Sequence, residues 1–273
     1  MASYHGRFLW YELLTTDVEA AKAFYAKVVG WGTRNASMPG MAYNLFIAAD
    51  AMIGGAMNLP PDVAGTDATP RWIGYVGVDD VDAAADRVRQ LGGTIRTPPT
   101  DVADISRFAI VADPQTATLA LIKGRQSGQR EPAALRARGR VGWHELLTTD
   151  CEQGLAFYRE LLGWQRGIAY PDATGTYQQF STGGQTIGGL LTKPPNFPTP
   201  FWLYYFNVGD VDAAAQRVTA GGGRILNGPI EAPDGSWTLQ CLDPQGAAFA
   251  LIGKRSYQAV GFMERVLPRP SAK

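Results

Sequence analysis

The chain has 273 residues, and its 25 Lys and Arg balance 25 Asp and Glu, so it has no net positive charge with which to attract nucleic-acid phosphates. Its two cysteines, Cys151 and Cys241, are too few for a disulfide framework and lack the CxxC spacing of zinc or redox sites, so we expect buried or half-buried free thiols. No signal-peptide pattern and no apolar run of about 18 residues is present, and we expect a cytoplasmic protein that binds neither nucleic acid nor membranes.

The first predicted unit is a strand followed by a helix and further strands. Residues 8–14 combine aromatic and aliphatic side chains with one charge, which predicts a strand. Asp17 offers an N-cap, apolar residues follow at helical spacing over residues 18–29, and Gly30 suits the C-cap, so this segment is expected to be a one-sided helix. Two strands and a Pro- and Gly-rich connection complete the unit, at residues 43–47, 53–59 and 60–70.

The same order restarts at residue 73. Residues 73–78 predict a strand, Asp80 an N-cap, and residues 81–91 a helix that ends at Gly92. The segment that begins at Asp80, DVDAA, echoes DVEAA at Asp17, so this half of the chain is itself doubled. Strands are then expected at residues 94–96, 108–112 and 118–123.

A long repeat divides the chain into two halves. Residues 6–31 and 139–164 share 15 of 26 aligned residues at a constant spacing of 133, which is the size of a domain. The second half is predicted to have helices at 151–162 and 211–220 and strands at 141–147, 177–180, 187–191, 202–208, 237–242 and 248–252. The predicted organisation is a first domain at 1–124 (modules 6–59 and 71–124), a linker at 125–138, a second domain at 139–254 (modules 139–192 and 201–254) and a C-terminal tail at 255–273.

Several short motifs recur along the chain. They are Asp-x-x-x-Ala at helix starts, Phe-Tyr late in the first helix of each half, Gly-Trp behind it, and Asp-Pro-Gln beginning at Asp113 and Asp243. In these motifs the chain resembles the vicinal oxygen chelate superfamily, which includes glyoxalases, extradiol dioxygenases and bleomycin-resistance proteins. The resemblance covers residues 6–124 and 139–254. It implies an α+β fold in which four βαβββ-type modules pair into two glyoxalase-like domains, each a curled mixed sheet around a cavity with helices outside.

The resemblance also locates two possible metal sites. In metal-dependent members a His typically stands seven residues before the Asp that starts each helix, and a Glu seven residues after the Asp of the final Asp-Pro turn. These side chains alternate inward along their strands and converge on one divalent ion. In this chain the corresponding residues cannot bind a metal: Trp10, Ile73, Ala120, Trp143, Leu203 and Ala250. We therefore expect no metal and no cofactor.

The two histidines are not expected to replace these ligands. His144 lies one residue beyond a ligand position, and a one-residue step turns a strand side chain to the opposite face. Its counterpart in the first half is Tyr11, which argues against a ligand role common to both halves. His144 is thus predicted to be a hydrogen-bonded structural residue that faces the helices, and His5 a surface residue.

A carboxylate follows two residues after each of the two tryptophans. Glu12 and Glu145 therefore share the inward strand face with Trp10 and Trp143. A carboxylate in apolar surroundings is costly unless it is hydrogen-bonded or paired, and desolvation raises its pKa. Further inward residues are expected to be Tyr43, Met57, Tyr75, Tyr177, Tyr205 and Trp237, which complete the predicted ligand-binding set.

Three interpretations of the carboxylates stay open. Each Glu can lock its strands by accepting hydrogen bonds, can grip a small aromatic or heterocyclic molecule beside the aromatic rings, or can transfer a proton on a bound carbonyl compound. The leading hypothesis is metal-independent binding or sequestration of a small organic molecule. The alternative is a glyoxalase-, isomerase- or dioxygenase-type enzyme that uses Glu12 or Glu145 as a cofactor-free acid or base. We expect a monomer or a homodimer, because the duplication can replace the dimer that single-domain relatives form.

Overall fold

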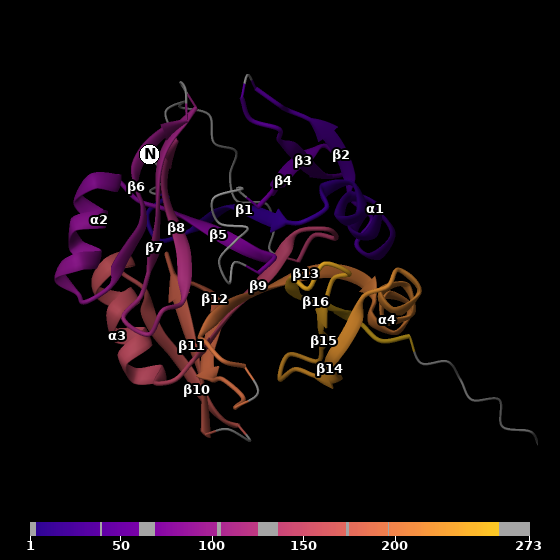
Figure 1. Cartoon of the computed structure of the whole chain (residues 1–273). Coiled ribbons are helices and arrows are strands. Elements are labelled where there is room, and N and C mark those ends of the chain that lie inside the picture. Colours follow the sequence, from indigo (N-terminus) through magenta and orange to yellow (C-terminus); the bar gives the residue numbers. More distant parts are fainter. Residues whose placement is uncertain are drawn as a thin grey trace, which may run out of the picture.

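The computed structural model describes residues 4–38, 40–59, 69–102, 105–124, 136–172, 175–195 and 197–256. Most of the predicted linker, tail and 60–70 connection lies outside these residues. Within them the chain forms four α-helices and sixteen strands. The strands make two eight-stranded sheets, one from each half of the chain (Figure 1). The α+β class and the two-sheet arrangement that the repeat and the motifs implied are therefore confirmed.

The first sheet has the strand order β2-β3-β4-β1-β5-β8-β7-β6. Helix α1 (Val18–Val28) follows β1, and α2 (Val81–Gln90) follows β5. β1 runs parallel to β4 and antiparallel to β5, and β5 runs parallel to β8, so the sheet is mixed. The strands are β1 (Phe8–Thr15), β2 (Gly32–Asn35), β3 (Asn44–Ala48), β4 (Ala51–Asn58), β5 (Arg71–Gly77), β6 (Thr94–Val102), β7 (Ser106–Ala112) and β8 (Thr118–Gly124).

The second sheet repeats this plan in the order β10-β11-β12-β9-β13-β16-β15-β14. Helix α3 (Cys151–Leu162) follows β9, and α4 (Val211–Ala220) follows β13. The strands are β9 (Val141–Thr148), β10 (Gln165–Asp172), β11 (Gly175–Thr182), β12 (Gln185–Thr192), β13 (Phe201–Asp210), β14 (Arg224–Glu231), β15 (Trp237–Leu242) and β16 (Ala248–Lys254).

An aspartate caps each of the four helices, as the sequence predicted. The side chains of Asp17, Asp80, Asp150 and Asp210 each accept a hydrogen bond from the backbone N–H three residues later, at 2.8–3.0 Å. The longest helix, α3, has 12 residues. None of the helices in the described ranges is long and apolar enough to span a membrane.

The outer strands are where the predicted elements and the structure differ. β2, β10 and β14 are exposed strands at sheet edges with no clear apolar alternation, and the sequence did not indicate them. The edge strand β6 was expected over residues 94–96 but continues to Val102 through Pro98 and Pro99. Proline is tolerated there because an edge strand has one side without ladder partners.

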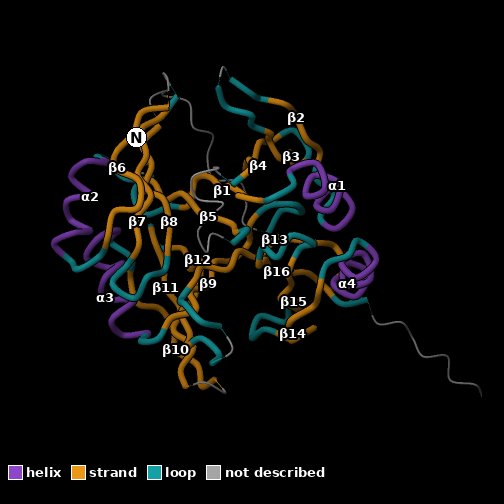
Figure 2. The backbone as a smooth tube through the Cα atoms, viewed as in Figure 1, coloured by secondary structure: helices purple, strands orange, loops and turns teal. Residues whose placement is uncertain are grey.

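The two sheets share one hydrophobic core. In Figure 1 each sheet bends like a U, with β1 and β5 at the base of one U and β9 and β13 at the base of the other. The bases lie back to back, α1 lies beside α4, and α2 lies beside α3 (Figure 2). Buried residues of all four helices and of both sheets belong to a single cluster, which includes Leu13, Tyr25, Trp164 and Phe206.

The Gly-Trp motifs join the two halves. The indole of Trp31 donates to the carbonyl of Gly139 at 2.7 Å, and the indole of Trp164 donates to the carbonyl of Gly6, also at 2.7 Å. Both indoles are buried. Because each half of the chain supplies the acceptor for the other, the two contacts are related by an approximate twofold axis.

The Phe-Tyr and Asp-Pro-Gln motifs meet across the same axis. Tyr25 donates its hydroxyl to Asp243 at 3.1 Å, and Tyr158 donates to Asp113 at 3.0 Å. Burial raises the pKa of both aspartates, and the hydrogen bonds they accept lower it only in part. The motifs that recur in the sequence are therefore mainly residues of the contact between the halves.

Tyr11 and His144, which occupy equivalent positions, contact each other at 2.6 Å between the Tyr hydroxyl and Nε2. Nδ1 of His144 lies 2.7 Å from the carbonyl of Ile187, which can only accept, so Nδ1 carries the proton and Nε2 accepts from Tyr11. The Phe8 ring stacks on the imidazole with centroids 4.0 Å apart. His144 is thus a buried structural residue that faces the shared core, as predicted.

Candidate functional site

The inner face of each U carries an apolar cluster separate from the shared core. Along β1, Leu13 belongs to the shared core, whereas Trp10 and Leu14 belong to the cluster of the first inner face. Strand alternation therefore turns Glu12 toward the first inner face. In β9, Trp143 and Leu147 belong to the cluster of the second inner face, which turns Glu145 the same way.

Four polar side chains form a network on the first inner face. The Trp10 indole donates to the Tyr43 hydroxyl at 3.0 Å, Tyr43 in turn hydrogen-bonds Glu12, and Tyr75 donates to Glu12 Oε2 at 2.7 Å. Glu12 is only 9% exposed. Burial raises the pKa of Glu12, and the two phenol hydrogen bonds counteract this only in part.

A glycine makes room for the tyrosine in each network. A Cβ on Gly55 would collide with the hydroxyl and ring of Tyr43, and a Cβ on Gly189 would collide with the ring of Tyr177. Gly54 and Gly188, one residue earlier, instead let the neighbouring parallel strand approach closely. The paired glycines of β4 and β12 therefore serve two purposes, and one of them is to make room for the phenol that accepts from the inner-face tryptophan.

The second inner face has the four equivalent side chains and adds one residue. Trp143 donates to the Tyr177 hydroxyl at 2.6 Å, and Tyr205 donates to Glu145 Oε2 at 2.6 Å. The Gln240 amide donates to the same Glu145 oxygen at 3.2 Å and to the Tyr205 hydroxyl at 3.1 Å. Glu145 is 5% exposed.

Most residues of the predicted ligand-binding set lie together on the inner faces. Met57 packs in the cluster of the first inner face, and the others take part in the two networks just described. Trp237 is the exception, because it packs against the shared core on the opposite sheet face, and the guanidinium of Arg255 lies 4.7 Å from the centroid of its ring. Its expected inward position was therefore wrong by one residue of strand alternation.

Several inner-face residues were missed by sequence reasoning, among them Gln240, Phe108 and Ile110. Gln240 contacts the second network, while Phe108 and Ile110 lie on the first inner face, where the Phe108 ring is 6.1 Å from that of Tyr75. Counting alternate residues from buried Leu239 would have placed Gln240 inward, but the sequence alone did not fix which residues of β15 are buried.

The donor groups on the inner faces do not fit the metal site of metal-dependent superfamily members. Ala120 pairs with Tyr75 and Ala250 pairs with Tyr205, so these expected ligand positions do lie beside the networks, yet they carry only methyl groups. Within the described ranges, no group of three or more His, Cys, Asp and Glu residues could hold a metal ion. Glu12 is instead hydrogen-bonded by two phenols, and Glu145 by the phenol of Tyr205.

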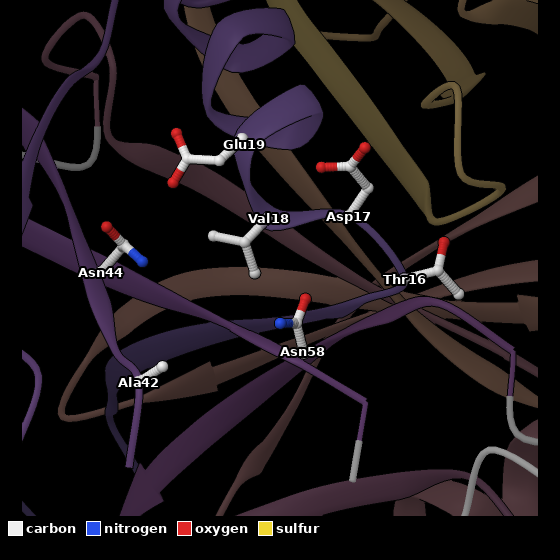
Figure 3. A pocket seen from close by; sticks show the side chains of 7 residues that line it. All are labelled: Thr16, Asp17, Val18, Glu19, Ala42, Asn44 and Asn58. Atoms are coloured by element: carbon white, nitrogen blue, oxygen red, sulfur yellow. The ribbon is translucent and has the colours of Figure 1, made fainter. Parts of the chain in front are cut away.

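A separate hollow of about 300 Å³ lies at the N-terminus of α1 (Figure 3). In the second half, Arg166 binds both Glu152 and Gln178 at the equivalent place, whereas the first half has the smaller Thr33 in the position of Arg166. The hollow thus corresponds to space that an arginine fills in the other half. It is lined by Thr16, Asp17, Val18, Glu19, Ala42, Asn44 and Asn58.

Glu12 is expected to make stability pH-dependent. Because burial raises its folded-state pKa above the unfolded value, the folded protein binds the proton more tightly between the two values, and stability falls as pH rises through that interval. Relative to Glu12→Gln, which has no such proton, the free energy of unfolding of the wild type should decline from about pH 4 upward. Urea unfolding of both proteins across this range checks the prediction. If the free energy of unfolding of the wild type minus that of the variant stayed constant or rose with pH, the prediction would be contradicted.

Comparison with known proteins places both halves in one family. The family model described as Glyoxalase/Bleomycin resistance protein/Dioxygenase superfamily matches residues 7–121 and 140–251. The chain is 33% identical over 247 residues to "Putative glyoxylase CFP32" of Mycobacterium tuberculosis (strain CDC 1551 / Oshkosh), covering 89% of this chain and 93% of the relative. It is 30% identical over 271 residues to "Anthracycline biosynthesis protein DauV" of Streptomyces sp. (strain C5), covering 90% and 92%.

Solved structures with this fold are similar over most of the chain. The Mn(II)-bound glyoxalase from Novosphingobium aromaticivorans has a TM-score of 0.63 at 17% identity and covers 93% of this chain and 84% of its own. The 2,3-dioxygenase LapB from Pseudomonas sp. KL28 has a TM-score of 0.62 at 13% identity and covers 93% and 94%. At these identities the similarity concerns the fold alone.

Proposed function

Because the chain belongs to the Glyoxalase/Bleomycin resistance protein/Dioxygenase superfamily, we propose that it binds a small aromatic or heterocyclic molecule on the inner faces of its sheets, without a metal ion. One observation carries the proposal. Each inner face has a Trp–Tyr hydrogen bond and a Tyr–Glu hydrogen bond where a metal-dependent relative would need ligands, and apolar side chains occupy the expected ligand positions.

The inner faces offer the contacts that such a molecule needs. Trp10, Tyr43 and Phe108 on the first face are only partly buried, so their rings can cover a flat ligand, and stacking and apolar burial would supply the affinity. Glu12 supplies an acceptor that fixes the orientation of a hydroxyl, amide or positively charged group. A fully polar, strongly hydrated molecule would gain no affinity from this surface.

The name of one relative supports an aromatic ligand. The Streptomyces relative is named for anthracycline biosynthesis, and anthracyclines are fused aromatic ring systems with hydroxyl groups. A molecule of that kind matches both the aromatic surface and the carboxylate. The ligand class we propose is therefore a planar aromatic molecule with at least one hydrogen-bond donor.

A second candidate function is proton transfer on the bound molecule. It is favoured by the raised pKa of Glu12, since a carboxyl group with a pKa nearer neutrality can both give and take a proton. In this case the Glu12→Gln variant would keep ligand affinity but lose turnover of a carbonyl-containing substrate. Loss of affinity without any turnover by the wild type would favour binding alone.

Calorimetric titration with a hydroxyanthraquinone tests the binding proposal. We expect a complex whose affinity is unchanged by EDTA, and we expect Trp10→Ala combined with Trp143→Ala to lower the affinity by about tenfold or more, because each ring is lost from an inner face. Trp237→Ala is the matched control, since Trp237 lies on the other sheet face. Stoichiometric metal by plasma mass spectrometry together with EDTA-sensitive binding would contradict a metal-independent site.

A further inference from the structure

The two inner networks differ at one polar position. Gln240 in β15 lies opposite Ala250, and Ile110 in β7 lies opposite Ala120, so the two residues are equivalent in register. Each alanine is paired on its other side with the tyrosine that donates to the network glutamate. The chain therefore contains the same site twice, once with an amide and once with an aliphatic side chain.

Gln240 acts on the second face as a built-in donor. Its Nε2 lies 3.2 Å from Glu145 Oε2 and 3.1 Å from the Tyr205 hydroxyl, and it donates to both. Tyr205 therefore donates one hydrogen bond and accepts another. The amide thus provides a hydrogen-bond donor for two buried acceptors, the Glu145 carboxylate and the Tyr205 hydroxyl.

The first face lacks this donor. Tyr75 donates to Glu12 Oε2, and in the part of the chain described here no donor reaches the Tyr75 hydroxyl. Ile110 offers only carbon atoms, although Glu12 and Tyr75 are 9% and 6% exposed. Among the described residues, the Tyr75 hydroxyl and the Glu12 carboxylate thus lack the shared donor that Gln240 supplies to Tyr205 and Glu145 on the second face.

A second difference points the same way. Phe108, whose ring lies 6.1 Å from that of Tyr75, belongs to the first inner cluster. The equivalent residue in the second half is Thr238, whose hydroxyl hydrogen-bonds the backbone carbonyl of Ile230. At this position the first face therefore carries an aromatic ring where the second face carries a hydroxyl group that already has a partner, which suits an aromatic ligand on the first face.

From these differences we propose that the first inner face is the ligand site and that the second is a structural copy closed by its own Gln240. The ligand is an aromatic molecule whose hydroxyl or amide N–H donates to Glu12 and Tyr75, at the place that the Gln240 amide takes beside Glu145. This assignment rests on the proposed function and adds to it one site, one donor group and a stoichiometry of one per chain.

Exchanging the two residues tests the assignment. In calorimetry with a hydroxyanthraquinone whose hydroxyl is remote from its carbonyls, the wild type should bind one equivalent. Ile110→Gln should weaken binding by about tenfold or more, because its amide takes the place of the ligand donor. Gln240→Ile, the matched control on the other face, should leave the dissociation constant within about twofold. Ile110→Met introduces an apolar side chain about as long as that of Gln, so a clearly smaller loss of affinity in Ile110→Met than in Ile110→Gln separates the donor effect from steric effects and misfolding.

Unsubstituted anthraquinone supplies the complementary half of a double cycle. Removing the hydroxyl should weaken binding to the wild type, but should change binding to Ile110→Gln far less, because there the donor position is already filled. Binding of two equivalents, or equal binding by the wild type and Ile110→Gln, would overturn the one-site assignment while leaving the proposed function standing. No binding of either compound by the wild type would overturn both.

Discussion

Asp243→Ala is expected to lower the free energy of unfolding by about 3–4 kcal/mol, because three donors lose their hydrogen bonds to this carboxylate at once. Asp243 is 4% exposed. Its Oδ1 accepts from the backbone N–H groups of Gln245 and Ala247 at 3.0 and 2.9 Å, and its Oδ2 accepts from Tyr25 at 3.1 Å. Loss of the carboxylate therefore removes hydrogen bonds both within the turn at residues 243–247 and between the two halves of the chain. Urea unfolding followed by far-ultraviolet circular dichroism measures it.

Three variants control this experiment. Asp113→Ala removes the equivalent carboxylate, which holds Tyr158 in the same way, and should cost a similar amount. Asp243→Asn keeps the Oδ1 acceptor and should cost less. Asp86→Ala removes an exposed carboxylate whose partner is Arg89 on the same helix, and should change stability by about 0.5 kcal/mol or less. If Asp243→Ala stayed within about 1 kcal/mol of the wild type, the contact between the halves would not depend on this carboxylate.

His144 is expected to make the protein sensitive to acid. Burial lowers the pKa of its imidazole to about 4, compared with about 6.5 in an unfolded chain, although the hydrogen bond to Ile187 opposes the shift. Between these pH values, His144 is therefore protonated in the unfolded chain but neutral in the folded protein. Stability present above about pH 6.5 should be lost progressively toward pH 4, by about 3 kcal/mol in total.

The comparison with His144→Gln isolates this contribution. Because the raised pKa values of Glu12, Asp113 and Asp243 act in the opposite direction and are common to both proteins, they cancel in the difference. The wild type should lose stability faster than the variant as pH falls. Should the variant not fold, the C–H proton resonances of His144 in the wild type give its pKa directly, and a value near 6.5 would refute the argument.

Much of the fold could be predicted because local signals were strong. Asp17 followed by apolar residues at helical spacing predicted the first helix, and the 133-residue repeat gave α3 with its observed bounds and the second sheet its plan. β14 could not be predicted in this way, because its side chains are mostly exposed and carry no alternation. β14 forms by pairing with β15, the next strand along the chain, and this pairing imposes no pattern on its exposed side chains.

The candidate site was predictable in part for the same reason. The period of two along β1 and β9 placed Glu12 and Glu145 beside their tryptophans correctly, since both strands are buried throughout much of their length. Partners from other strands were harder. The approach of Tyr43 to Glu12 depends on the absence of a Cβ at Gly55, and the role of Gln240 depends on which residues of β15 face the core. Both features depend on how the strands pack against one another, so the sequence of a single segment does not predict them.

The contact between Tyr11 and His144 shows an advantage of a tandem chain over a symmetric dimer. In a dimer of identical chains, a residue on the twofold axis meets its own copy, so two unlike side chains can never form a complementary pair there. Covalent linkage of the copies removes that restriction, and here it joins a phenol donor to an imidazole acceptor. The same freedom applies to Ile110 and Gln240. A tandem chain can assign one copy of a site to recognition and the other to holding the fold, a division of labour closed to a symmetric dimer.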